Sequence, residues 1–261
     1  MSKLKKVFLS FAIIAISFID NASLIRSNIG GRSSSIGYAK KEYIPASQYI
    51  QDGLNVMFDA IENVSELTHD SSSLVWLDLV GGLRMDMSSS AWTDSSFVCS
   101  ESNNGHVNWK TMPEYPGFPL YMTIEVVVRN CQDNHFSRNS LVFGGREYQR
   151  MNLVRSTIPN VWGMSYLKDG FFFGNSGTVS AVFSDSSSTD RTIYVNGSSS
   201  ETTGSFKENF GISGIQGISI NARSDYPFNG EVCCIRLYRR KLTEEEIAYN
   251  AAIDKKRFSL P

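Results

Sequence analysis

The sequence is poor in the patterns that usually mark catalytic and metal sites. Its 261 residues include four cysteines and only three histidines, His69, His106 and His135, which lie far apart in the chain. No Cys-x-x-Cys pair occurs, which argues against a structural zinc site. The chain also lacks Gly-x-Ser-x-Gly, P-loop and His-Glu-x-x-His patterns. We therefore expect that the protein is not an enzyme of a familiar kind.

An excess of charge of either sign is also missing. The chain has 25 Lys and Arg against 26 Asp and Glu, for a net charge of −1. A nucleic-acid-binding protein normally carries a basic excess on one element, so we expect no nucleic-acid partner. Hydrophobic residues make up 41% and aromatic residues 12% of the chain, which is enough for the core of one large β-domain.

The N-terminus has an apolar run that is too short for a comfortable membrane span. Residues 7–19 are mostly apolar and follow Lys3, Lys5 and Lys6, whereas a span needs about 20 apolar residues. A basic region before a short apolar region is the layout of a secretory signal, and we favour export. The alternative is a hydrophobic anchor or a buried segment within residues 1–19. Residues 20–48 are rich in Gly and Ser and are predicted to form a linker or tether.

Four cysteines do not make a disulfide framework. Cys99 and Cys131 are able to pair if their strands are neighbours. Cys233 and Cys234 are adjacent on a predicted strand, so their side chains should point to opposite faces, one in the core and one near the surface. A bridge between adjacent cysteines requires strained geometry. We therefore expect free, partly buried thiols.

Short segments with alternating apolar and polar residues recur along the chain. This period of two residues is typical of half-buried antiparallel strands. Serine-rich and Asn-Gly turns separate the segments, and Asn196-Gly197 in particular favours a tight hairpin. Many short strands with regular turns predict an all-β sandwich rather than βαβ units. The predicted strands span residues 54–58, 83–87, 122–128, 179–183, 191–195, 218–220 and 232–238.

One helix is predicted, at the C-terminus. Thr243 with Glu246 three residues later is a capping-box pattern, in which each side chain satisfies backbone donors at the helix start. The helix is expected over residues 244–255, followed by basic residues that suit its C-terminal dipole.

The C-terminal segment 228–247, Phe-x-Gly-x-x-x-x-Ile-Arg-x-Tyr-x-Arg-x-Leu-Thr-x-x-Glu-Ile, resembles the closing motif of laminin-G-like domains of the concanavalin A-like lectin/glucanase superfamily. Segments 53–59, 76–82, 118–128 and 193–197 resemble further landmarks of that family, in the same order. The resemblance covers about residues 49–258, and the opening of this region is similar to proteins of gut bacteria and their phages. It implies a jelly-roll, concanavalin A-like antiparallel sandwich with a short C-terminal helix.

The same superfamily includes glycoside hydrolases, which place catalytic carboxylates in a Glu-x-Asp-x-x-Glu pattern on one strand. No Glu-x-Asp occurs in this chain. Glu125 lies on a predicted strand without a carboxylate two residues away, and the alternation around it predicts a solvated, outward-facing side chain. Cys233 and Cys234 stand where the family often has acidic residues.

Binding is therefore the better hypothesis, and sugar recognition commonly uses an exposed aromatic ring that stacks on the pyranose face. The aromatic candidates next to turn-like sequence are Trp92, Trp109, Trp162 and Tyr226, whereas we assign Trp76 to the core. Laminin-G-like domains often hold calcium at a loop rim. Candidate acidic residues here are Asp59, Glu62, Asp70 and Asp225, but no spacing singles them out, and the sequence supports no commitment to a metal.

The sequence thus predicts a non-catalytic, lectin-like recognition module that is secreted or displayed on a cell surface and binds a glycan or a surface protein. The alternative is a structural or interaction protein of a phage or cell-surface appendage, associated with the virion, whose N-terminal segment is the anchor. A glycoside hydrolase is the third and least favoured interpretation. A membrane contact is expected only through the N-terminal segment if it is not cleaved.

Overall fold

The computed structural model describes residues 43–100, 103, 105–107, 123–132, 139–143, 153–156, 161–164, 170–172, 174–183, 191–200, 219–220 and 228–261. All strand pairs in this part of the chain are antiparallel. The prediction of an all-β antiparallel sandwich with a short C-terminal helix is confirmed.

The elements are η1 (Ala46–Gln48), β1 (Leu54–Asp59), β2 (Val75–Leu77), β3 (Arg84–Met87), β4 (Trp92–Thr93), β5 (Ser96–Cys99), β6 (Gly105–Val107), β7 (Thr123–Arg129), β8 (Asn139–Phe143), β9 (Leu153–Ser156), β10 (Val161–Met164), β11 (Gly170–Phe172), β12 (Gly177–Phe183), β13 (Arg191–Val195), β14 (Ser198–Ser200), β15 (Ser219–Ile220), β16 (Gly230–Tyr238) and α1 (Glu244–Arg257).

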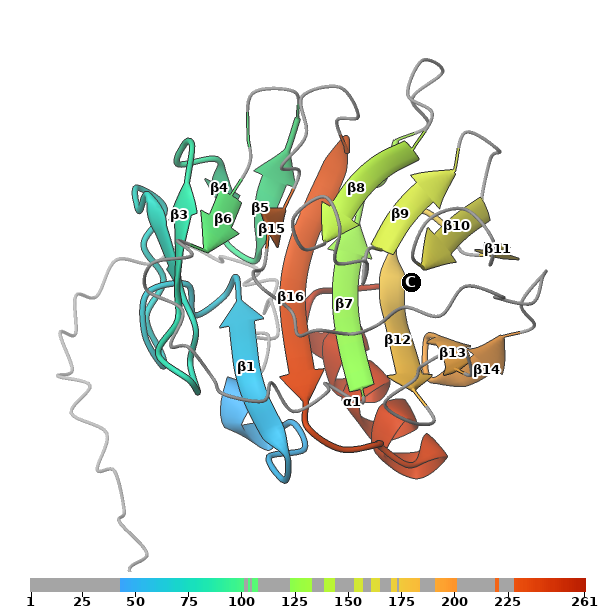
Figure 1. Cartoon of the computed structure of the whole chain (residues 1–261). Helices are drawn as coiled ribbons and strands as arrows, with labels where there is room; N and C mark the ends of the chain where they lie inside the picture. Colours follow the sequence, from blue (N-terminus) through green and yellow to red (C-terminus); the bar gives the residue numbers. More distant parts are fainter. Residues whose placement is uncertain are drawn as a thin grey trace, which may run out of the picture. The chain divides into compact units, whose positions relative to one another are not determined.

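The large sheet is organised around the long strand β16 (Figure 1). Its order is β14-β13-β12-β7-β16-β5-β4, and β1 also pairs with β16. One edge of β16 is paired with β7, whereas β5 and β1 share the other edge: β5 pairs with Gly230–Val232 and β1 with the half that ends at Tyr238. The β-branched and aromatic residues of β7 and β16 suit these central positions.

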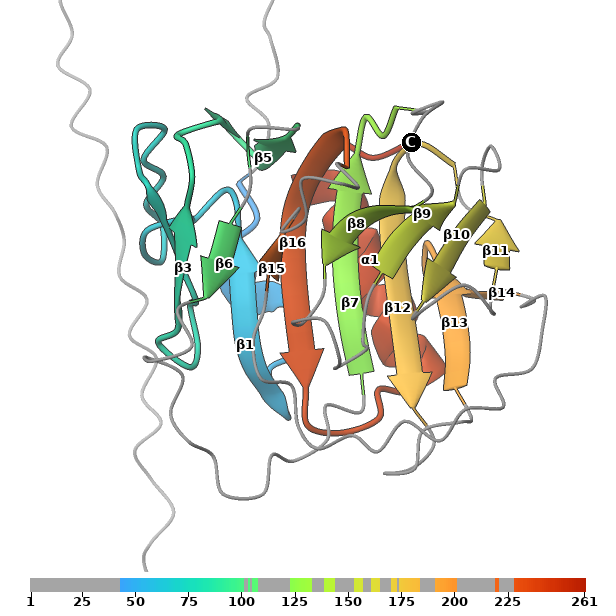
Figure 2. The same cartoon turned by 45° about the horizontal axis from the view of Figure 1, so that its top comes forward.

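The inner face of the large sheet forms the main hydrophobic core. Val126 and Val128 of β7 and Ile235 of β16 are fully buried there, together with Trp76 of β2 and Met85 of β3. We call this group and its neighbours the first core cluster. It joins the large sheet to the smaller sheet β15-β6-β3-β2. The assignment of Trp76 to the core is confirmed, since none of its surface is exposed. Figures 1 and 2 show the third sheet, β11-β10-β9-β8, lying across the same face.

The outer face of the large sheet is covered as well, by helix α1 (Figure 2). Tyr238 of β16 and Ile247 and Ile253 of α1 are buried in a second core cluster, which also includes Ala46 and Tyr49 from the segment before β1. The helix starts with the predicted capping box: the Thr243 side chain accepts from the Glu246 backbone, and the Glu246 side chain accepts from Thr243. The sheet is therefore buried on both faces.

The two adjacent cysteines of β16 do not point to opposite faces. Cys233 and Cys234 are both fully buried and both belong to the second core cluster. The register of β16 against β7 shifts between Val232 and Cys234, so Cys233 is the extra residue of a β-bulge. A bulge breaks the alternation of side chains, which places both thiols on the same side. The prediction that one of them lies near the surface was wrong because α1 covers that side.

The predicted Asn196-Gly197 hairpin connects β13 to β14. Both residues have positive φ, 51° and 84°, as a two-residue hairpin turn requires. A methyl group at Gly197 would lie 3.0 Å from the Cα atom of Ala248 in α1, so the turn also needs glycine for its close approach to the helix. In the described ranges, no helix combines the length and apolar character that crossing a membrane requires.

The predicted signal or anchor, residues 1–19, and most of the predicted linker lie outside the described residues. The last residues of the predicted linker, 43–48, lie against the domain. Ala46 is buried and donates its backbone N–H to Glu62, and the Arg257 guanidinium donates to the carbonyl of Ile44. The chain is therefore attached to the sandwich before β1 begins.

Candidate recognition site

Trp92 is the one predicted binding residue whose side chain lies within the described part of the chain. It is half-buried and packs edge-to-face against Trp76 and Phe97, with ring centroids 5.2 and 5.1 Å apart. Its indole N–H donates to the carbonyl of Ser73 over 2.8 Å. The ring is thus anchored on the core side and partly accessible on the other. A fixed orientation of this kind suits a stacking platform, and its role in glycan binding stays a prediction.

The loop next to Trp92 is held by side-chain hydrogen bonds to its backbone. The Asn63 amide donates to the Asp70 carbonyl over 2.9 Å, and its oxygen accepts from the Asp70 N–H over 2.8 Å. The His69 ring stands edge-on to Trp92, 6.5 Å between centroids, and its Nδ1 lies 2.9 Å from the carbonyl oxygen of Ala60. Asp70 accepts from the backbone and hydroxyl of the exposed Ser72, which lowers the pKa of the Asp70 carboxyl. An aromatic ring therefore lies beside a fixed polar loop.

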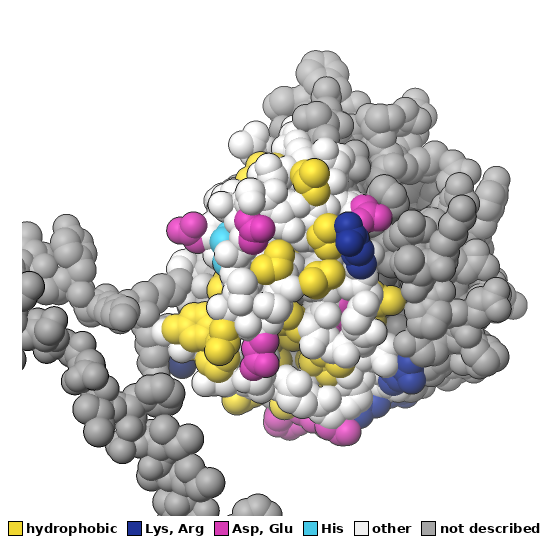
Figure 3. Space-filling view, turned by 90° about the vertical axis from the view of Figure 1, so that its left-hand side faces the viewer, with side chains coloured by type: hydrophobic (Ala, Val, Ile, Leu, Met, Phe, Trp, Pro, Cys, Tyr) yellow, Lys and Arg dark blue, Asp and Glu magenta, His cyan; other side chains and the backbone are white. Residues whose placement is uncertain are grey.

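The side of the molecule that carries β2 and β3 exposes apolar side chains, Leu67 at 67%, Leu74 at 56% and Val80 at 47%. Figure 3 shows this side, with hydrophobic side chains in several small groups that are separated by polar and acidic ones. Apolar side chains scattered in this way are normal on a protein surface and do not by themselves mark a binding site.

The Trp-x-Asp-Leu-x-Gly turn that follows β2 is built around one carboxylate. Asp78 is buried and accepts hydrogen bonds from the backbone N–H groups of Met57, Val80, Gly81 and Leu83, at 2.7 to 3.3 Å. Burial raises the pKa of this carboxyl, and the four donors oppose the rise. A methyl group at Gly81 would lie 2.8 Å from the Asp78 carboxylate, which explains the small residue at this position. The motif is therefore a structural support for the turn between β2 and β3 and for its attachment to β1.

We expect Asp78→Asn to lower the free energy of unfolding by about 2–3 kcal/mol. The NH2 group of asparagine is a hydrogen-bond donor, and it would lie against backbone N–H groups that are also donors. Urea unfolding of the variant and of the wild type measures this difference. The matched control is Asp94→Asn, at an exposed position, which should change stability by less than about 0.5 kcal/mol. Equal effects of the two substitutions would contradict the supporting role of Asp78.

The other aromatic candidates cannot be placed in a site. Trp109 and Tyr226 lie outside the described residues, and Trp162 lies in strand β10 with its side chain outside the description. Their roles in binding stay predictions. Asp225, one of the candidate calcium ligands, also lies outside the described residues.

Two of the candidate calcium ligands form an internal ion-pair cluster. Asp59 and Glu62 are fully buried, and the Arg257 guanidinium lies 2.8 Å from the Asp59 carboxylate and 3.4 Å from that of Glu62. Glu62 also accepts from the Tyr43 hydroxyl and the Ala46 backbone. In the residues that the structure describes, no three side chains of the metal-ligating kinds come together. The positions of Asp59 and Glu62 indicate a role in fixing the segment before β1.

The outward-facing prediction for Glu125 was wrong. The side chain does point to the outer face of the sheet, but that face lies under α1, and none of Glu125 is exposed. Its carboxylate pairs with Arg236, the register neighbour on β16, over 2.8 Å and also accepts from Ser180 and Asn250. Burial raises the pKa of Glu125, and the guanidinium opposes the rise.

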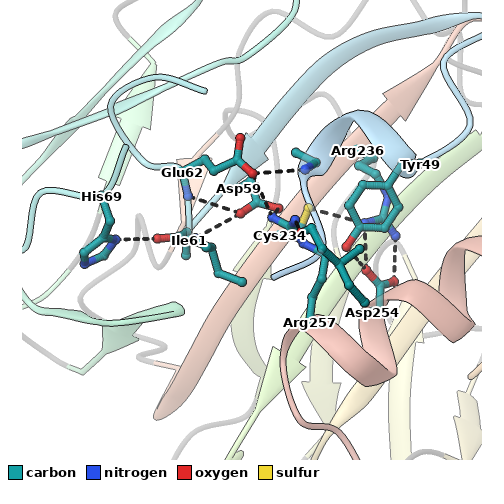
Figure 4. Close-up of polar contacts among 12 residues, drawn as sticks. Tyr49, Asp59, Ile61, Glu62, His69, Cys234, Arg236, Asp254 and Arg257 are labelled. Atoms are coloured by element: carbon teal, nitrogen blue, oxygen red, sulfur yellow. Dashed lines mark hydrogen bonds and ion pairs between the residues drawn. The ribbon is translucent and has the colours of Figure 1, made fainter. Parts of the chain in front are cut away.

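Asp254 of α1 completes this buried network, and Figure 4 shows it beside Arg236 and Tyr49. It receives two hydrogen bonds from Arg236, at 2.7 and 2.8 Å, and one each from Tyr49 and Thr178. Arg236 also lies 4.0 Å from the centre of the Tyr49 ring. All four carboxylate oxygens of Glu125 and Asp254 accept hydrogen bonds from the protein, so the arrangement serves to join the helix and Tyr49 to the sheet. Sequence reasoning missed this network. The available signal was one charged residue in each of two otherwise apolar predicted strands, Glu125 and Arg236, which face each other across β7 and β16.

Comparisons with known proteins found similarity in fold but not in sequence. No protein-family model and no curated protein matches the chain. The binding domain of botulinum neurotoxin DC, solved in complex with rat synaptotagmin II, is 13% identical, with a TM-score of 0.55 over 78% of this chain and 52% of that chain. Trypanosoma rangeli sialidase in complex with sialic acid is also 13% identical, with a TM-score of 0.53 over 78% of this chain and 33% of that chain. The chain thus spans only a third to a half of these proteins, and the similarity shows the fold alone.

Proposed function

We propose that the protein is a non-catalytic recognition module of the laminin-G-like, concanavalin A-like type, which binds carbohydrate or protein through the rim around Trp92. The family part of the proposal is supported by the ordered sequence landmarks between residues 49 and 258. The similarity in fold to the binding domain of a botulinum neurotoxin is consistent with it.

The observation that carries the proposal is the position of Trp92. Its ring is held from below by Trp76 and Phe97 and is bordered by a loop whose polar groups are fixed. A rigid aromatic platform next to the exposed hydroxyl of Ser72 and the exposed carboxylate of Asp70 offers both components of sugar recognition, apolar stacking and directional hydrogen bonds. Because the platform and the loop are already ordered, little conformational entropy is lost on binding.

Four acidic residues buried in the described part of the chain form structural ion pairs. A glycosidase that uses two carboxyl groups holds them about 5 to 9.5 Å apart on either side of a sugar-binding cleft. Glu125 and Asp254 are instead fully buried and bind the same guanidinium. Asp59 and Glu62 are also buried beside an arginine.

A glycan array probed with the full chain tests the proposal. We expect binding to at least one glycan class and, for Trp92→Ala, an affinity about five- to thirtyfold lower, since loss of one stacked aromatic is worth about 1–2 kcal/mol. The matched control is Tyr249→Ala, which removes an exposed aromatic ring from helix α1. It should leave the affinity unchanged.

Trp92 also packs on the core, so a second variant keeps the test valid if Trp92→Ala unfolds. Ser72→Trp adds bulk at an exposed position of the loop and leaves the packing of Trp92 intact. It should block binding while the thermal unfolding temperature stays near that of the wild type. An array that stays blank at high protein concentration would remove the lectin assignment and favour the appendage protein.

We also propose that the protein is exported, with residues 1–19 as the signal. Mass spectrometry of the mature N-terminus decides between cleavage and a retained anchor. A mature chain that still begins at Met1 would contradict the proposal.

A further inference from the structure

Helix α1 covers the outer face of the large sheet (Figure 2) and exposes its other side. That exposed side includes four charged residues and two alanines, namely Glu244, Glu245, Ala248, Ala252, Lys255 and Lys256. At about 100° of rotation per residue, these six fall within about 120° of the helix circumference. They therefore form one continuous face, which we call the outer helix face.

The charges on the outer helix face are separated by sign. Glu244 and Glu245 lie in the first turn, and Lys255 and Lys256 lie in the last. The two pairs are about 16 Å apart along the axis, since the rise is about 1.5 Å per residue, so they cannot meet within one helix. The other charged residues of these two turns form ion pairs with the rest of the domain, whereas these four have no ion-pair partner among the described residues.

The order of these charges makes the face complementary to a second copy of itself. In an antiparallel pair of α1 helices with a two-fold axis level with Asn250, Glu244 lies opposite Lys256 of the second copy. Glu245 lies opposite Lys255 in the same way, and the axis repeats both contacts. Each acidic end thus meets a basic end, whereas a parallel pair would bring like charges together.

The middle of the outer helix face is small. With the same axis, Ala248 lies opposite Ala252 of the second copy, so no long side chain stands between the two backbones. Small residues at a contact allow helix axes to approach to about 8 Å. The turn at Gly197 borders the face beside Ala248 and leaves this alanine exposed. Tyr249 lies at the margin and has no counterpart in the pairing, because Ala251 is buried.

We propose that two copies of the protein associate through their outer helix faces and form an antiparallel, two-fold symmetric dimer. The helix has 14 residues and is about 21 Å long, so the interface is small and the dimer is weak. Trp92 packs on the first core cluster, at the other face of the large sheet. The dimer therefore leaves the rim around Trp92 free and presents it twice, which raises the avidity for a repeated ligand.

Sedimentation velocity of the full chain at several concentrations tests the proposal. We expect a monomer at about 5 μM and a mass that approaches two chains at about 500 μM, as for a weak complex. Sodium chloride at about 1 M should reduce the dimer fraction, because it screens exposed charges. A chain that stays monomeric at both concentrations would overturn the proposal and assign the charges to the helix dipole alone.

Charge reversal identifies the surface. Glu244→Lys with Glu245→Lys makes all four charges positive, and Lys255→Glu with Lys256→Glu makes all four negative. Each double variant alone should be monomeric at about 500 μM, whereas an equal mixture of the two should form a heterodimer at least as readily as the wild type. The proposal fails if the mixture stays monomeric, or if both variants still associate alone, as contacts through the apolar residues 7–19 would allow.

A neutral variant decides the question if reversed charges unfold the helix. Ala252→Gln keeps the charges and suits an exposed helix position. It adds bulk at the centre of the contact and should raise the dissociation constant at least about tenfold, with Tm near that of the wild type. The matched control, Glu66→Lys with Asp94→Lys, reverses two exposed acidic residues outside α1 and should associate like the wild type. An unchanged dissociation constant for Ala252→Gln would place the contact elsewhere and overturn the proposal.

Discussion

Replacing Arg236 with methionine is expected to lower the free energy of unfolding by about 3–5 kcal/mol, because it leaves two carboxylates buried without a positive charge. Arg236, Glu125 and Asp254 have no exposed side-chain surface, and the guanidinium lies 2.8 and 2.7 Å from the two carboxylates. Methionine has a similar length and no charge, so the effect of lost packing is kept small. Urea unfolding followed by tryptophan fluorescence measures the difference.

The matched control is Arg84→Met, which breaks the ion pair of Arg84 with Asp86. The side chains of that pair are 60% and 37% exposed, so the substitution should cost less than about 1 kcal/mol. Arg236→Lys should fall between the two, since a lysine keeps the charge but cannot donate to both carboxylates in the forked geometry of a guanidinium. If Arg236→Met costs no more than Arg84→Met, the network does not hold α1 to the sheet.

The strands and the capped helix could be predicted because each depends on local sequence. In β7, Ile124, Val126 and Val128 were predicted to share one face, and all three are buried in the first core cluster. The alternation also showed correctly that Glu125 lies on the other face. The alternation could not show that this face is buried. A polar residue in an alternating strand either faces solvent or pairs with a polar group of another element, and the pattern is the same in both cases.

The face of helix α1 that packs on the sheet is also difficult to recognise from the sequence. Its buried face includes Asn250, Asp254 and Arg257 as well as Ile247 and Ile253. Polar residues of this kind are normally assigned to solvent, so hydrophobic periodicity alone does not identify the face that packs on the sheet. The register of β7 against β16 places Arg236 opposite Glu125, and only the packing of α1 on the sheet brings Asp254 to the same guanidinium.

The candidate site was predictable to a similar extent. The sequence placed Trp92 beside a turn, and the structure adds that its ring packs on Trp76 and Phe97. The contact with Trp76 of β2 depends on how the two sheets are stacked, whereas Phe97 is the direct partner of Trp92 in the local pairing of β4 with β5. The β-bulge at Cys233 was not predictable for a related reason, because the shift of register belongs to a pair of strands and not to one.

Replacing Arg257 with methionine is expected to destabilise the domain in a way that depends on pH. At pH 7.5 the loss should be about 3–5 kcal/mol, because Asp59 and Glu62 would remain buried without their guanidinium. In the wild type, burial raises the pKa of Asp59 from 3.8 to about 6, although the Arg257 charge opposes the rise. Without that charge, the pKa of Asp59 in the variant must be higher still.

The direction of the pH effect follows from which state binds the proton. An acid with a raised pKa in the folded state holds a proton that the unfolded chain has released, so its contribution to stability falls as pH rises from about 4 through about 6 in the wild type. In Arg257→Met this window extends to higher pH. Lowering the pH from 7.5 to 5 protonates Asp59 in the variant, and the difference from the wild type should shrink to about 1–2 kcal/mol.

Urea unfolding at pH 5, 6 and 7.5 measures the difference between the two proteins. The control is the double variant Asp59→Asn with Arg257→Met, in which the titrating carboxyl is replaced by a neutral amide of the same size. Its difference from Asp59→Asn alone should vary much less with pH. A loss on Arg257→Met that is equal at pH 5 and pH 7.5 would show that Arg257 acts through its contacts with the Ile44 carbonyl and the Phe258 ring rather than through the Asp59 charge.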